Sequence, residues 1–144
     1  MIATVQTDSS EVTMSDVPEI PVIEMVRPMP GFSDDQQFAL VRLDEDGTLC
    51  EFRSITHDDL RFLVVTPGVF FAGYAPEITD EDVAALELAG PEEALVLVVL
   101  NAGMSLEQTT GNLVAPIIVN TVNRRALQVV LDDRRHPIAA PLLG

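Results

Sequence analysis

The segment Gly111-Asn112-Leu113-Val114-Ala115-Pro116-Ile117-Ile118-Val119-Asn120 is apolar at nearly every position between its two asparagines. Two further apolar runs flank it in the sequence, Ala94–Leu100 and Leu127–Leu131. Short runs rich in Val, Ile and Leu predict β-strands. Because these strands do not alternate apolar with polar residues, we expect them to be buried on both faces or to pack beneath neighbouring segments.

Four shorter segments upstream also have a strand pattern. They are Glu19–Pro28, Gln37–Leu43, Leu49–Arg53 and Leu60–Thr66. Asp46-Gly47 separates the second from the third and predicts a β-hairpin, because this pair favours a tight turn. The last of these segments is interrupted at Pro67-Gly68, after which Val69–Tyr74 continues the apolar pattern.

One helix is predicted between the two groups of strands. Thr79 can serve as its N-cap, and the acidic residues at positions 80 to 82 favour the positive end of the helix dipole. Val83 and Leu86 fall on one face, and Gly90 is the expected end.

About seven short strands and one short helix predict a mostly β protein, folded as a single small antiparallel barrel-like or collapsed-sandwich domain. The length of 144 residues is that of one domain. We expect this domain to span residues 19–144. Residues 1–18 lack periodicity and predict a flexible acidic N-terminal tail.

The charge of the chain is strongly negative and unevenly placed. The net charge is -15, and all eight basic residues are arginine. Residues 1–93 contain 20 acidic residues and 4 arginines, a net charge of -16. This balance argues against nucleic acid as a ligand and against binding to an anionic membrane. It favours steering of basic protein partners, although acidic residues also serve solubility alone.

The remaining composition indicates a soluble cytoplasmic protein. The single cysteine, Cys50, allows no intramolecular disulfide, which fits a reducing compartment. The N-terminal residues are acidic where a signal peptide needs positive charge and an apolar run. The longest apolar run, Ala94–Leu100, is about a third of a membrane span.

A catalytic, cofactor or metal site is not predicted. Cys50, His57 and Asp58 are the one thiol, imidazole and carboxylate set close in sequence, and a cysteine nucleophile needs such a base. Cys50 lies within a predicted alternating strand, so a half-buried structural thiol is the favoured interpretation. His136 is remote from both, and no zinc-type spacing, calcium loop or phosphate loop is present.

The predicted function is therefore binding, and ten residues are candidates for contact with a partner. Acidic doublets and triplets in turns supply charge, and aromatic residues are enriched in the centres of interfaces. The acidic and aromatic candidates are Asp34, Asp35, Asp44, Glu45, Asp46, Phe70, Phe71 and Tyr74. Core packing is the alternative role for the aromatic residues.

Several strings of the sequence resemble, in order and spacing, the flagellar assembly factor (FliW) family. The strings are Pro30-Gly31-Phe32, Phe52-Arg53-Ser54-Ile55, Phe62–Pro67 leading to Tyr74, Thr110–Asn120, Gln128–Leu131 and Pro141-Leu142. The most specific is Asn-Leu-x-Ala-Pro-Ile-x-x-Asn at 112–120. The resemblance covers about Ile20 to Leu142. It departs from the family pattern at Gly111, where a β-branched residue is expected, and in the length of the acidic tail.

The resemblance implies a cytoplasmic bacterial protein that binds the RNA-binding regulator CsrA and also binds flagellin, the two partners competing in effect. Free flagellin occupies the factor, and its export releases the factor to sequester CsrA, which relieves repression of flagellin translation. Asn112 and Asn120 are the two motif positions that complete the set of ten candidates. An asparagine beside a strand also commonly satisfies backbone groups in a turn.

Two other classes of function remain open on the residues alone. A generic acidic inhibitor or nucleic-acid mimic would bind any basic protein and lose its affinity at moderate salt. A small hydrolase or ligand-binding barrel would need a pocket with convergent polar groups near Cys50 and His57.

Overall fold

The computed structural model describes residues 2–4, 19–29, 31–45, 48–57, 59–68, 70–71, 73–131 and 136–142. Its elements are β1 (Ile2–Thr4), β2 (Ile20–Met25), β3 (Gln37–Arg42), β4 (Leu49–Ser54), β5 (Arg61–Val65), β6 (Glu77–Thr79), α1 (Asp80–Leu86), β7 (Ala94–Asn101), β8 (Thr110–Asn120), β9 (Arg125–Gln128) and β10 (Ala140–Pro141), with 3-10 turns at Pro91–Glu93 and Leu106–Gln108.

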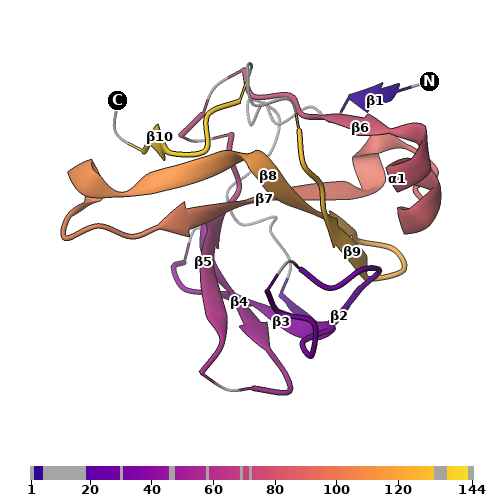
Figure 1. Ribbon diagram of the computed structural model, residues 1–144, viewed down its shortest axis with the longest axis horizontal. Coiled ribbons are helices and arrows are strands. Elements are labelled where there is room, and N and C mark those ends of the chain that lie inside the picture. The colour runs from indigo at the N-terminus through magenta and orange to yellow at the C-terminus, as the bar shows by residue number, and fades with distance from the viewer. Residues whose placement is uncertain are drawn as a thin grey trace.

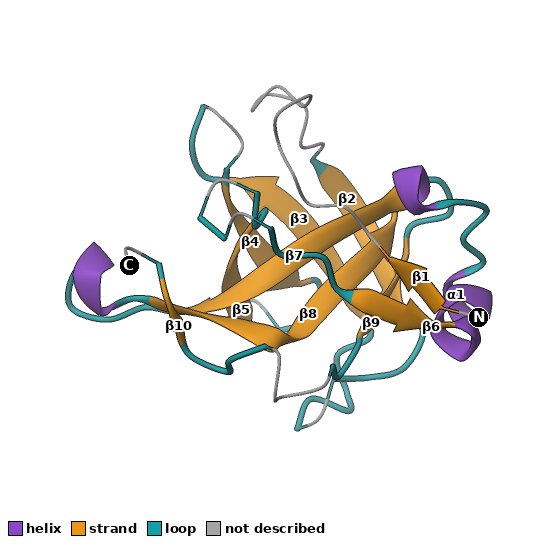
Figure 2. Ribbon diagram, turned by 90° about the horizontal axis from the view of Figure 1, so that it is seen from above, coloured by secondary structure: helices purple, strands orange, loops and turns teal. Residues whose placement is uncertain are grey.

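Seven strands close into a barrel. Their order is β8-β7-β5-β4-β3-β2-β9, and β9 returns to pair with β8 (Figures 1 and 2). These are the seven strands that the sequence predicts, and the mostly β, barrel-like fold with one short helix is confirmed. Among the described strand pairs, β2 with β9 is parallel and the others are antiparallel.

The interior of the barrel is filled by alternating residues of its strands. On β3 and β4 every second side chain points inward, and the rings of Phe38 and Phe52 stack there with centroids 4.5 Å apart. The buried members of this core are Ile20, Ile23, Met25, Met29, Phe38, Leu40, Cys50, Phe52, Val64, Leu97, Ile117, Val119 and Ala126. Cys50 is thus a structural core residue, and it is fully buried where the sequence analysis expects a half-buried thiol.

A second core lies outside the barrel wall, beneath α1, β6 and the segment that precedes them (Figure 1). On β7, Leu97 points into the barrel while Val96 and Val98 point into this outer core. On β8, Ile117 and Ile118 divide in the same way. The continuous apolar character of these strands is therefore burial on both faces, as the sequence indicates.

The Asn112–Pro116 part of the motif forms a bulge in β8. From Leu97 to Val99 on β7, the paired positions on β8 shift from Ile117 to Asn112, so β8 accommodates extra residues here. The Asn112 side-chain oxygen accepts hydrogen bonds from the amides of Val114 and Ala115, both at 3.2 Å. Pro116 has no amide hydrogen to contribute to a ladder and is tolerated at such a bulge.

Three short strands were not predicted. β1 pairs with β6, and β10 pairs with β8 at Thr110–Gly111. β1 falls within residues 1–18, which the sequence assigns to a flexible tail; residues 5–18 lie outside the described residues. Two to three residues carry too little periodicity to distinguish a strand from a loop, and only the neighbouring segments provide their pairing.

Two boundaries differ from the sequence interpretation. The described residues of 69–74 form turns and not a strand, with the amides of Phe70 and Phe71 bonded to the carbonyl of Pro67. Helix α1 ends at Leu86 because Glu87 takes a left-handed conformation, with φ of 56°, and it does not continue to Gly90. Thr79 is the N-cap as predicted, since its hydroxyl accepts from the Asp82 amide at 3.2 Å.

Candidate partner-binding surfaces

One group of acidic side chains lies at the turn between β3 and β4. Asp44 and Glu45 are exposed there, and Asp46 lies outside the described residues. The Asp44 carboxylate accepts hydrogen bonds from the amides of Thr48 at 3.0 Å and Leu49 at 3.3 Å, so it also shapes the turn. The structure adds Glu19, whose carboxylate accepts from the amide of Arg42 at 3.0 Å. This end of the barrel is therefore acidic.

The other predicted acidic pair lies at the opposite end of β3. Asp34 is exposed, whereas Asp35 is buried and accepts hydrogen bonds from the Ser54 hydroxyl at 2.6 Å and from Nδ1 of His57 at 2.7 Å. The Ser54 and His57 hydrogen bonds lower the pKa of Asp35. The Asp35 hydrogen bond and charge raise the pKa of His57, with smaller contributions from Asp59 and Asp34.

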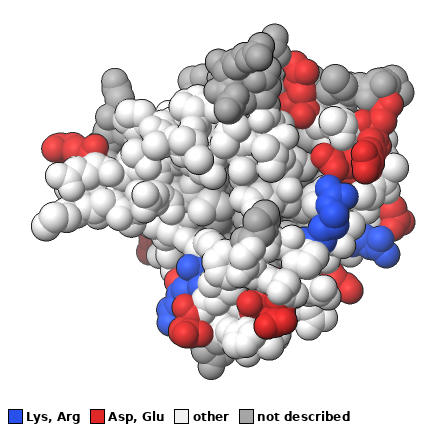
Figure 3. All heavy atoms as spheres, in the orientation of Figure 1, with Lys and Arg blue, Asp and Glu red and all other residues white. Residues whose placement is uncertain are grey.

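The predicted acidic residues do not form one site. Six residues of β3 separate the two groups, which is about 20 Å along an extended strand. A third group, at positions 80 to 82, lies on α1, where Asp82 pairs with Arg27 at 3.0 Å. Acidic side chains are accordingly spread over several parts of the surface (Figure 3).

The aromatic candidates belong largely to the outer core. Phe71 and Tyr74 are buried, and the Tyr74 hydroxyl donates to the carbonyl of Leu113 at 2.6 Å. Burial also raises the pKa of this hydroxyl. Phe70 is half-buried and packs against the same core. Contact of these three residues with a partner remains a prediction. Of the three, Phe70 has a partly exposed side chain.

Gly111, the departure from the family pattern, is explained by Phe71. A Cβ atom at position 111 would lie 2.9 Å from the Phe71 ring and 3.0 Å from Val98. Such separations are shorter than van der Waals contact allows, so the aromatic ring requires a glycine beneath it.

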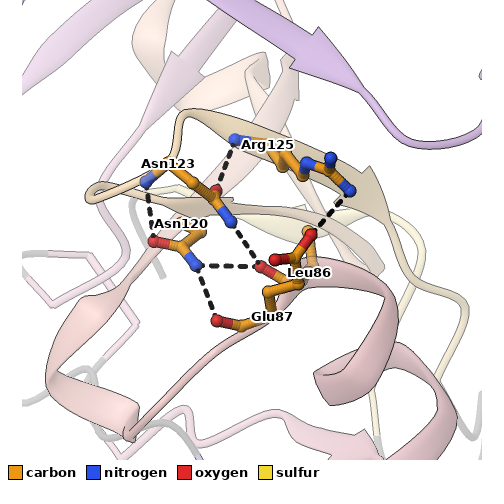
Figure 4. A network of polar contacts seen from close by, with 5 residues as sticks. All are labelled: Leu86, Glu87, Asn120, Asn123 and Arg125. Atoms are coloured by element: carbon orange, nitrogen blue, oxygen red, sulfur yellow. Dashed lines mark hydrogen bonds and ion pairs between the residues drawn. The ribbon is translucent and has the colours of Figure 1, made fainter.

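Asn120 joins the β8–β9 turn to the end of α1 (Figure 4). Its amide nitrogen donates to the carbonyls of Leu86 at 2.8 Å and Glu87 at 3.3 Å, and its oxygen accepts from the amides of Val122 and Asn123. The Asn123 side chain donates to Leu86 as well, at 3.1 Å. Asn120 is only 1% exposed. Both motif asparagines thus satisfy backbone groups; partner contact by either remains a prediction.

The structure does not bring Cys50 and His57 together. Cys50 points into the barrel, and burial raises the pKa of its thiol to about 11, so it is protonated at neutral pH. Ser54 lies about 13 Å from Cys50 along β4, and His57 follows the end of that strand, where it is bonded to Asp35. A cysteine nucleophile with His57 as its base is therefore ruled out by this geometry.

The residues that sequence reasoning missed are exposed apolar side chains in the connections that follow β7, β8 and β9. Met104, Val122, Val130 and Ile138 are 69% to 96% exposed. Val130 falls in a predicted buried strand, and its alternation with buried Val129 is the signal that could have shown its exposure. In Figure 3, few charged side chains lie between the β7–β8 hairpin and the α1 side of the molecule.

Across the described parts of the chain, no three His, Cys, Asp or Glu side chains are placed to hold a metal ion together. Nor does any helix of those parts have the length and apolar character needed to cross a membrane.

Comparison with known proteins gives one consistent answer. A sequence model described as "FliW protein" matches residues 4–142. The flagellar assembly factor FliW of Bacillus subtilis (strain 168) is 34% identical over 116 residues, covering 81% of each chain. That of Syntrophus aciditrophicus (strain SB) is 32% identical over 130 residues, covering 90% of this chain and 82% of the relative. A crystal structure of the flagellar assembly factor FliW superposes with a TM-score of 0.81 at 25% identity, covering 86% of each chain.

Proposed function

The chain belongs to the FliW family of flagellar assembly factors, and from this we propose that it binds the translational regulator CsrA and flagellin. Binding to CsrA relieves repression of flagellin translation, and flagellin acts as the competing, chaperoned partner. The observation that carries the proposal is the family match over residues 4–142, which includes the whole barrel and its outer core. The protein acts in the cytoplasm by binding these partners, and not by catalysis.

The charge distribution supports the CsrA part of the proposal. The β3–β4 end carries Glu19, Asp44 and Glu45 beside Arg42, within a chain of net charge -15. A regulator of RNA needs a basic surface for phosphates. An acidic protein docked near that surface is attracted to it and also repels the RNA.

The deciding experiment measures binding of the purified chain to purified CsrA and to purified flagellin by calorimetry. We expect saturable binding to each, with flagellin lowering the amount of CsrA bound. The readout of function is release of a flagellin leader RNA from CsrA. Failure to bind either protein at low ionic strength would sink the proposal.

The generic acidic inhibitor is the competing function, and a matched control separates it. A basic protein of unrelated fold, such as cytochrome c, should bind weakly or not at all at physiological salt if recognition is specific. Binding of cytochrome c as tight as that of CsrA, lost for both as salt rises, would favour the generic inhibitor.

A further inference from the structure

The chain beyond β9 has an outer edge that β2 does not cover. The amides of Val129 and Leu131 donate to the β8 carbonyls of Pro116 at 3.0 Å and Val114 at 2.7 Å. Successive amides of an extended strand point to opposite sides, so the backbone groups of Gln128 and Val130 face away from β8.

On that outer side the pairing with β2 has already ended. β2 pairs with β9 through Glu24 and Met25, and the final bond runs from the Val26 amide to the Ala126 carbonyl at 2.8 Å. Within the described ranges, no backbone hydrogen bond reaches the outward groups of Gln128 or Val130. The edge therefore presents two amides and two carbonyls in extended geometry.

These groups line a groove of about 330 Å³. The groove is lined by Arg27, Pro28, Asp82 and residues 127–130. Pro28 has no amide hydrogen, so it cannot complete the ladder from the facing side. Val130 is 79% exposed, far more than the valines of the paired barrel strands.

We propose that this edge, from Gln128 to Val130, binds an extended segment of a partner protein by strand addition. Only an extended chain offers unpaired main-chain groups at the matching two-residue spacing, because the main-chain groups of a helix bond to one another. The exposed Val130 fits an apolar side chain of the partner. Asp82 of α1 also lines the groove, where its carboxylate pairs with Arg27 at 3.0 Å.

The probe for this site is a phage-displayed library of random dodecapeptides, selected on the wild-type protein. Val130→Pro deletes the outward amide and leaves the Val129 and Leu131 bonds to β8 intact, because an edge strand tolerates proline. Val130→Thr is the matched control, since it keeps the amide and the β-branched shape. We expect the selected peptides to bind the proline variant about tenfold more weakly and the threonine variant almost unchanged.

A second measurement uses the wild-type protein and does not depend on the variant folding. Amide hydrogen exchange of Gln128 and Val130, followed by NMR, should slow by about tenfold or more in the peptide complex. Equal binding of the proline variant, unprotected amides, helical selected peptides or an empty selection each overturns the proposal. Self-association of the wild type that Val130→Pro abolishes assigns the edge to a second copy of the chain, which overturns it as well.

Discussion

Asn120 is expected to contribute to the stability of the fold through its hydrogen bonds. It bonds two carbonyls at the end of α1 and two amides of the β8–β9 turn while almost fully buried. Replacing it by alanine removes all four bonds, of which the bond to the Leu86 carbonyl is buried and the other three are partly buried. Unsatisfied buried polar groups cost about 1–3 kcal/mol each.

We therefore expect Asn120→Ala to lower the free energy of unfolding by about 2–3 kcal/mol in a urea titration. Asn120→Asp should be similarly harmful, since it keeps the acceptor but loses both donors. The exposed neighbour is the control: Asn123→Ala removes its bond to Leu86 and the one it accepts from the Arg125 amide, both at or near the surface, and should cost less than about 1 kcal/mol. Equal losses for the two asparagines would show that burial is not the decisive factor.

Gly111 and Phe71 are two residues whose substitutions are expected to have coupled effects on stability. Gly111→Ala places a Cβ atom 2.9 Å from the Phe71 ring, and overpacking of this kind costs about 1–3 kcal/mol. In the background of Phe71→Leu, the same change should cost much less, because the ring edge is gone. A double-mutant cycle by urea unfolding measures the coupling. Additive losses would mean that Val98, and not Phe71, determines the need for glycine.

At the scale of elements, the Asp35–His57 pair ties the loop before β3 to the loop after β4. Asp35 is buried in the first loop and His57 is half-exposed in the second, with 2.7 Å between Nδ1 and the carboxylate. The pair adds most when the carboxylate is ionised and the imidazole is charged. Both loops also contain exposed acidic residues, Asp34 and Asp59, which favour the charged imidazole.

This pair predicts a pH-dependent difference between the wild type and His57→Gln. The pKa of His57 is raised above its ordinary 6.5, so its contribution is complete below pH 6.5 and lost as pH rises through the raised value. The pKa of Asp35 is lowered from 3.8, so its contribution is complete above pH 3.8 and lost as pH falls through the lowered value. The difference in unfolding free energy between the wild type and His57→Gln should therefore be largest between pH 3.8 and pH 6.5. A gap that stays constant from pH 5 to 9 would contradict an ionic pair.

At the scale of the whole molecule, we expect the acidic charge to affect how fast the proposed partner CsrA associates. Glu45→Gln with Asp46→Asn removes two charges near the β3–β4 turn and keeps Asp44, which holds the turn through the Thr48 amide. We expect association with CsrA to slow by about two- to fivefold at low salt, with a weaker salt dependence, by stopped-flow fluorescence. Glu92→Gln with Glu107→Gln makes the same charge change elsewhere and is the control. Equal slowing by both double variants would mean that net charge alone, and not this end of the barrel, steers the partner.

Much of this architecture follows from local patterns in the chain. Alternating residues in Gln37–Arg42 and Leu49–Ser54 indicate one buried face, and continuous apolar runs in Ala94–Asn101 and Thr110–Asn120 indicate two. Thr79 followed by three acidic residues marks the start of the helix. These features can be predicted locally because propensity, periodicity and capping act over a few neighbouring residues.

The sites depended on contacts between distant parts of the chain. The burial of Asp35 depends on Ser54 and His57. The hydrogen bond to the last carbonyl of α1 comes from Asn120, 34 residues away, and the need for glycine at position 111 comes from the Phe71 ring. The edge at Gln128 and Val130 is open because the neighbouring strand, β2, ends before it reaches these residues. Sequence therefore determined the seven barrel strands, the start of the helix and the family of this protein. The tertiary structure alone decided the three short strands and which side chains and edges face outward, because burial and hydrogen bonding are set by closure of the barrel.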